Sequence, residues 1–232
     1  MARKRVSHAA WLEWLKAIEQ DIYGLHADRL YWRETVRIVK SNPHIPEPGY
    51  VMDWITRMYV SHIGSGIRRQ MEESPRVVSL RRLLASMRSH PSLLTRKAFV
   101  KAWCAGDEND DFEARCATSA FDDYAAKGTD HVDRRLIEGD ISLLAETGAT
   151  VKDFVDERVA HYDKAHARAD ELARLAAPTF KELNDALDLL GTLLKKYYQL
   201  LTGNALVSAE PVPQMYWTHP YTVAWMPVEE EE

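Results

Sequence analysis

The 232-residue sequence contains only two cysteines, Cys104 and Cys116, so it lacks the disulfide framework that stabilises small secreted domains. It also lacks an apolar run of the roughly 18 to 20 residues that a transmembrane helix needs. The first ten residues carry positive charge, but Glu13 and Lys16 interrupt the segment where the apolar core of a signal peptide would follow. We therefore expect a cytoplasmic protein that does not enter a membrane.

Motifs that mark several common enzyme classes are absent. The sequence has no glycine-rich phosphate loop, no G-x-S-x-G nucleophile turn and no HExxH zinc motif. The acidic loop 106–111 is similar to the start of a calcium loop, but Phe112 replaces the required glycine and Thr118 the required glutamate. The two cysteines lack a histidine at zinc-finger spacing, because His131 lies much further along the chain. We expect no metal and no cofactor.

The sequence also lacks an excess of positive charge. It has 30 Lys and Arg and 35 Asp and Glu residues, for a formal net charge of −5. This balance argues against a protein coated in nucleic acid, since neutralising phosphates requires a basic surface. Basic residues nevertheless gather between positions 68 and 101. The candidates there for an RNA-facing surface are Arg68, Arg69, Arg81 and Arg82. A charged helix exterior, solvated or paired with Glu72 and Glu73, explains the same cluster.

Helical periodicity dominates the first half of the sequence. Residues 8–40 carry apolar side chains at alternating spacings of four and three, which predicts one long helix with a coiled-coil-like seam. The seam consists of Trp11, Leu15, Ile18, Ile22, Leu25, Trp32, Val36 and Val39. Arg29 interrupts it, and an arginine in such a seam is suited to bind a carboxylate across a helix pair.

Prolines divide the next residues into shorter helices. Residues 41–49 contain three prolines and a glycine, which end the first helix. A second helix is predicted over residues 50–73, and its buried face is predicted to consist of Val51, Ile55, Met58 and His62. Ser79 is predicted to cap a third helix, and Pro91 to open a fourth that ends near Trp103.

The second half is also predicted to be helical, with no strand pattern before residue 204. The acidic loop 106–111 is the candidate boundary between two helical halves. A helix is expected over residues 111–127, where Gly128 is suited to end it. Asp130 is expected to cap the helix that follows.

The sequence contains signals for both ends of the last helix. Thr179 and Glu182 form a capping box at its start, and Gly203 closes it. Residues 1–203 are thus predicted to form an all-α helical bundle with long coiled-coil-like helices, and residues 204–232 an extended tail. The tail is aromatic and acidic, and we expect it to dock on the body or on a partner subunit through Tyr216, Trp217, Tyr221 and Trp225.

Residues 150–163, TVKDFVDERVAHYD, carry the strongest candidate for chemistry. Valines recur there at spacings of four, which predicts an amphipathic helix with a buried stripe. On another face Arg158 and His161 are three residues apart and therefore neighbours. Arginine can hold a phosphate, and histidine can transfer a proton near neutral pH. The commoner arrangement is an arginine that is solvated or paired with Glu157 or Asp163, beside a histidine that hydrogen-bonds near a helix end.

The same segment resembles the signature of the HEPN superfamily, the small helical proteins of prokaryotic defence and toxin–antitoxin systems. That signature has an arginine, four to six residues of which the first is polar, and a histidine that often follows alanine. Ala160 and His161 match its end, so the resemblance makes His161 the family histidine. The two nearest family positions for the arginine fall on Val155 and Asp156, neither of which is arginine, and Arg158 is the candidate to take its role.

Two further stretches resemble the abortive-infection branch of the superfamily. They are residues 58–87 and the end of the last helix, LLKKYYQLLTG, and together with the motif they extend the resemblance over most of residues 8–203. The resemblance implies a symmetric dimer in which two copies of the His161 region face one cleft. The apolar seams of the long helices are the expected route of self-association.

Three functions follow from the resemblance and the residues. The first is a binding or neutralising module with a degenerate nuclease motif, paired in a defence or toxin–antitoxin system with a toxin or antitoxin such as a nucleotidyltransferase. The second is an active metal-independent endoribonuclease. In it His161 assists attack of a 2′-hydroxyl on the adjacent phosphate, and Arg158 stabilises the charge that develops. The third is a helical scaffold with no role in nucleic-acid binding.

Overall fold

The computed structural model describes residues 6–42, 49–104, 111–126, 128–159 and 177–212, without the side chains of Arg158 and Val159. Every regular element in these ranges is a helix, and two isolated bridges pair Thr95 with His131 and Ala125 with Val132. The predicted all-α class is confirmed. None of the described helices is long and apolar enough to span a bilayer.

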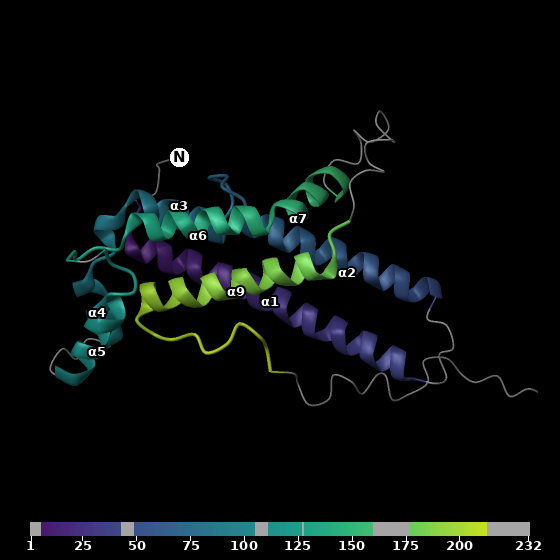
Figure 1. Ribbon diagram of the computed structural model, residues 1–232, viewed down its shortest axis with the longest axis horizontal. Helices are drawn as coiled ribbons and strands as arrows, with labels where there is room; N and C mark the ends of the chain where they lie inside the picture. The colour runs from purple at the N-terminus through teal and green to yellow at the C-terminus, as the bar shows by residue number, and fades with distance from the viewer. Residues whose placement is uncertain (1–5, 43–48, 105–110, 127, 160–176, 213–232) are drawn as a thin grey trace, which may run out of the picture.

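The longer helices run along the long axis of the molecule, and short helices lie at one end (Figure 1). The long set consists of α1 (His8–Ser41), α2 (Gly49–Gln70), α6 (Arg134–Thr147) and α9 (Phe180–Thr202). The end set consists of α4 (Arg96–Trp103) and α5 (Asp111–Phe121). The remaining elements are α3 (Leu80–Ser89), the 3-10 turn η1 (Pro91–Leu93), α7 (Ala149–Phe154) and the π-helical segment η2 (Val155–Val159).

Helix α9 lies at the centre of the bundle and packs against α1, α2, α4, α6 and α7. Its apolar side chains recur at alternating spacings of four and three, and the six residues of this seam are buried: Leu183, Leu187, Leu190, Leu194, Tyr197 and Leu201. The predicted capping box is present, with Thr179 and Glu182 each hydrogen-bonded to the other's backbone N–H. Gly203 ends the helix with φ = 72°, a left-handed conformation that favours glycine.

The seam of α1 is covered within the same chain. Its residues from Trp11 to Leu25 are buried, whereas Trp32, Val36 and Val39 are half-buried. Helices α9, α2 and α3 pack against α1. The buried parts of both seams are therefore occupied within the chain, and self-association through the half-buried end of the α1 seam stays a prediction.

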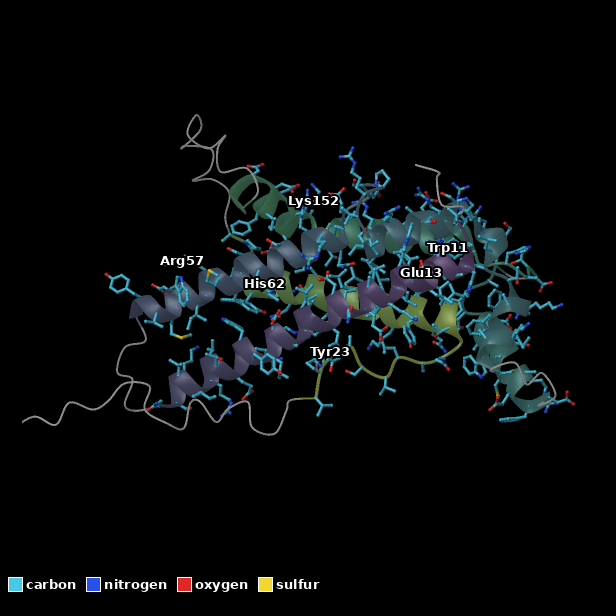
Figure 2. The ribbon with its side chains drawn as sticks, turned by 180° about the vertical axis from the view of Figure 1, so that it is seen from behind. Trp11, Glu13, Tyr23, Arg57, His62 and Lys152 are labelled. Atoms are coloured by element: carbon cyan, nitrogen blue, oxygen red, sulfur yellow. The ribbon has the colours of Figure 1, made fainter. Side chains whose placement is uncertain are left out.

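The predicted buried face of α2 is wrong. Val51 and Met58 are 64% and 57% exposed, and the exposed ring of His62 hydrogen-bonds Asp28 at 2.8 Å. The buried side chains belong to the neighbouring stripe of Tyr59, Ile63 and Ile67. The first turns of α2 project beyond the rest of the bundle, as do the last turns of α1, so no described helix covers the predicted face there (Figure 2).

The connection into α6 also differs from the prediction. Helix α5 ends at Phe121, before the expected position 127, and the chain then folds back so that Ala125 bridges Val132. Asp133, rather than Asp130, caps α6 and accepts a backbone hydrogen bond at 2.8 Å. Because the bridge uses the backbone up to Val132, the helix begins only after it.

The fourth predicted helix is divided into two elements. Its first residues form η1, and Thr95 then caps α4 through its hydroxyl. The candidate boundary at 106–111 falls mainly outside the described residues. Phe99 and Phe121, one from each side of it, pack with ring centroids 5.5 Å apart in one core. The division into two halves stays a prediction.

Candidate functional site

The motif segment begins as α7 and continues as η2, which packs against α2. Val151 and Val155 are buried, as their spacing predicts. Gly64 of α2 makes the close approach possible, because a Cβ at that position would lie 3.1 Å from Cγ2 of Val155. Arg68 follows Gly64 by one turn on the same face of α2, so it also faces the motif segment.

The π-helical hydrogen bonding of η2 changes the register of the motif. Each turn of a π-helix holds more residues than a turn of an α-helix, and such segments occur often at functional sites. The α-helical spacing on which the pairing of Arg158 with His161 was predicted therefore does not hold between Val155 and Val159. The Arg158 side chain and the whole of His161 lie outside the described residues, so their meeting stays a prediction.

Asp156 in η2 is bound by two cations. Nε of Arg68 donates to Oδ1 at 2.7 Å, and Nζ of Lys152 donates to Oδ2 at 2.6 Å. Figure 2 shows Lys152 on α7, close to α2. Glu72 contributes a second carboxylate, 3.1 Å from Nη1 of Arg68. These four residues, which we call the Asp156 cluster, join α2 to the motif and are formally neutral.

Hydrogen bonding fixes the charges in this cluster. Partial burial of Asp156 favours its neutral form, but the hydrogen bonds from Lys152 and Arg68 outweigh burial and hold the pKa of Asp156 below its ordinary value. The hydrogen bond to Asp156 likewise raises the pKa of Arg68. At neutral pH the carboxylate is therefore ionised, and the guanidinium of Arg68 is shared between Asp156 and Glu72.

Arg69, the second RNA-binding candidate, points to α1. Its Nε and Nη2 atoms donate to the two oxygens of Asp21 at 3.0 and 2.5 Å. The amide of Gln70 donates to the same carboxylate at 2.5 Å, and its carbonyl oxygen accepts the N–H of Leu80 at 2.9 Å. Arg69 therefore belongs to a network that joins α1, α2 and the start of α3.

Arg81 and Arg82, the remaining candidates, lie in the first turn of α3. Nε of Arg81 donates to Glu73 at 2.6 Å. The guanidinium of Arg82 lies 4.2 Å from the ring centroid of Trp14, and it donates to the Val77 carbonyl at 2.5 Å. All four candidates thus lie about the connection between α2 and α3, and each binds groups of the same chain. Their role in RNA binding stays a prediction.

A second polar cluster lies between α1, α9 and residues 204–212, which we call the strap. Arg29, only 5% exposed, donates to Asp188 at 2.6 Å and to Glu210 at 2.8 Å. The inference that Arg29 binds a carboxylate across a helix pair is confirmed, and the strap supplies an unforeseen second one. The buried ring of His26 completes the cluster, with Nδ1 lying 3.0 Å from Nη2 of Arg29.

Comparison with known families identifies the chain. The family model HEPN_AbiU2, described as AbiU2, matches residues 9–219. The chain belongs to the AbiU2 family of HEPN proteins. The resemblance to the abortive-infection branch is therefore confirmed, and the AbiU2 match includes the strap and part of the tail. No curated protein and no solved structure shows a significant match.

Membership of the AbiU2 family allows the Asp156 cluster to be compared with the HEPN signature. Of the two residues nearest to the arginine position of the HEPN signature, Val155 is buried and Asp156 is an ion-paired carboxylate. The nearest cation that a described side chain supplies from outside the motif is Arg68, 88 positions away along the chain. Sequence reasoning missed this contact because only the pair Lys152 and Asp156, at helical spacing, was readable locally.

Proposed function

We propose that this AbiU2-family protein is a partner-binding module of a defence system whose HEPN motif does not cleave RNA. The observation that carries the proposal is the carboxylate of Asp156 at a position that the HEPN signature assigns to arginine. Arg68 and Lys152 both bind this carboxylate. The carboxylate occupies both cations, so neither is free to stabilise the charge that develops on a phosphodiester during cleavage.

Arg68 does not replace the missing arginine in this proposal. Its Nε donates to Asp156 and its Nη1 lies near Glu72, so a phosphate would have to compete with two carboxylates. An arginine stabilises developing charge when its donors are free and already aimed at the reacting oxygens. The net charge of −5 works in the same direction, because it lowers the attraction of the whole chain for RNA.

These features suit a protein partner better than RNA. The resemblance to HEPN proteins of defence and toxin–antitoxin systems supports a toxin or antitoxin partner, such as a nucleotidyltransferase encoded next to this protein. We propose that the chain binds that partner as a homodimer. Co-expression with the neighbouring gene product, followed by titration calorimetry of the purified pair, measures the binding directly.

Cleavage assays test the absence of nuclease activity. We expect purified wild type, His161→Ala and Arg158→Ala to degrade RNA at the same background rate, with or without a chelator. His166→Ala is the matched control, because it removes a histidine of the same segment that is not part of the HEPN motif. Cleavage by the wild type that His161→Ala abolishes and His166→Ala preserves would overturn the proposal.

Cleavage that depends on His161 would establish the second candidate function, a metal-independent endoribonuclease. The feature that favours it is the intact end of the motif, Arg158, Val159, Ala160 and His161. In that function His161 assists attack of the 2′-hydroxyl, and Arg158 takes the role of the family arginine. Loss of cleavage in Arg158→Ala, with the helical circular dichroism spectrum unchanged, distinguishes this role from a loss of folding.

A further inference from the structure

The first turns of α2 present apolar side chains that no described element covers. Tyr50, Val51, Trp54 and Met58 are 93, 64, 56 and 57% exposed, and we call them the α2 patch. Four large apolar side chains together on one helix end mark a contact surface. Tyr59 follows the patch and stacks on Trp32 of α1 with ring centroids 4.4 Å apart. The patch therefore lies level with the last turns of α1, beyond Trp32.

The strap runs toward the end of the molecule that carries this patch. After Gly203 it turns back along α9 and α1, in the direction in which α1 approaches its C-terminus (Figure 1). The strap is held by contacts along its length: Leu206 packs against the core, Ala209 is 5% exposed, and Glu210 binds Arg29 of α1. The chain beyond Val212 therefore starts from a fixed place beside Arg29.

The residues that follow have the length and composition to cover the patch. Residues 213–226 contain two methionines, two tyrosines and two tryptophans and no charged side chain. An extended chain advances about 3.3 Å per residue, so the segment from Val212 to Trp225 spans up to about 43 Å. Helix α1 continues only about 18 Å beyond Arg29, at 1.5 Å per residue. The reach is more than sufficient.

The charge of the tail is complementary to that of the projecting ends of α1 and α2. The tail ends in four glutamates, 229–232, and residues 213–232 contain no lysine or arginine. The projecting ends of α1 and α2 carry Arg33, Arg37, Lys40 and Arg57 against Glu34 and Asp53, a balance of +2. Arg33, Lys40 and Arg57 form no ion pair with any residue that the structure describes. Figure 2 shows Arg57 on the projecting part of α2.

We propose that the aromatic segment 213–226 of the same chain docks on the α2 patch, with the terminal glutamates beside the cations of α1 and α2. The AbiU2 match ends at residue 219, so the first two tail aromatics, Tyr216 and Trp217, belong to the shared family region. The α2 patch is then an intramolecular docking site. The proposal does not depend on whether the HEPN motif cleaves RNA.

Hydrogen exchange in the full chain tests the docking. Peptide amides of residues 213–226 should exchange at least roughly tenfold more slowly than in an unstructured chain. Val51→Asp and, separately, Arg57→Glu should return this segment to the unstructured rate. Both positions are exposed, so neither substitution removes core packing. The first places a charge in the patch, and the second repels the glutamates.

Two control variants match these substitutions elsewhere on the surface. Leu143→Asp adds a charge at an exposed apolar position of α6, and Arg115→Glu reverses an exposed arginine of α5. Both should leave the tail protected. The proposal is overturned if the tail is unprotected in the wild type, or if it stays protected in both patch variants. Protection that rises with protein concentration would place the tail on a second copy and would also overturn it.

Discussion

His26 is a buried ionisable side chain whose burial has a measurable consequence. Its ring is 3% exposed, its Nδ1 faces the guanidinium of Arg29, and its Nε2 has no hydrogen-bond partner of normal geometry among the described residues. Burial and then the charge of Arg29 lower the pKa of His26 to about 4, although Asp188, Glu210 and the Leu187 carbonyl act in the opposite direction.

The free energy of unfolding should therefore fall as the pH drops from about 6.5 to about 4. Above this window the ring is neutral in both states. Within it the unfolded chain binds a proton that the folded protein does not, so protonation favours unfolding. The loss from this one residue approaches roughly 3 kcal/mol near the lower limit. Urea unfolding at several pH values measures it.

A His26→Gln variant isolates this contribution because glutamine does not titrate. We expect its stability to vary less with pH across the same window than that of the wild type. His62→Gln is the control, since it replaces a surface histidine of α2 and should leave most of the loss in place. If His26→Gln and wild type lost stability in parallel, titration of His26 would not be the cause.

The polar cluster of Arg29, His26, Asp188 and Glu210 shows which contacts of single residues can be predicted from sequence. A buried arginine in an apolar seam requires a partner for its charge, so its binding to a carboxylate was predictable. The identity of Asp188 and Glu210 was not, since they lie 159 and 181 positions away. Asp156 was recognised as a departure from the HEPN motif, but its contact with Arg68 depends on how α2 packs against η2.

Among the elements, helix ends with local signals were predicted well and helix faces less well. Ser79 and Thr179 cap their helices because a hydroxyl can reach a backbone N–H three residues on, which sequence alone determines. The start of α6 was missed because the bridge of Ala125 with Val132 takes precedence over Asp130 as a cap. The face of α2 was missed because exposure at its projecting turns is set by where its neighbours end.

The C-terminus of α9 offers a test of close packing. Gly203 has φ = 72°, and a Cβ there would lie 2.3 Å from the backbone nitrogen of Trp103. Gly203→Ala should therefore lower the free energy of unfolding by roughly 2–4 kcal/mol, from backbone strain plus a clash with main-chain atoms. Guanidinium unfolding of the purified variant measures this loss.

Gly128→Ala is a matched control for that substitution. Gly128 has a similar φ of 78°, but a Cβ there would meet nothing within 4 Å. Gly128→Ala should therefore lower the free energy of unfolding by only about 1 kcal/mol, which is the contribution of backbone strain alone. The difference between the two variants reports the contact between the end of α9 and α4. Equal losses would show that Trp103 moves aside without cost.

For the whole molecule, we expect a symmetric dimer, the closed assembly that the HEPN resemblance implies. Sedimentation equilibrium at micromolar concentration should give twice the chain mass of 26.6 kDa. Because we assign the α2 patch to the tail of the same chain, Val51→Asp should leave that mass unchanged. A monomer at all concentrations would contradict the dimer. A monomer in Val51→Asp alone would instead assign the α2 patch to a second copy.

The packing of α1 against α9 has a consequence for how the protein is made. The ribosome releases α1 first, but the helix that covers much of its seam is encoded after residue 179. At about 5–20 residues per second, roughly 8 to 32 seconds of synthesis separate the end of α1 from the end of α9. During that interval α1 can pair with α2 but not with α9, and Arg29 has neither of its carboxylate partners. The nascent chain therefore carries an apolar helix whose burial only the final stage of translation can complete.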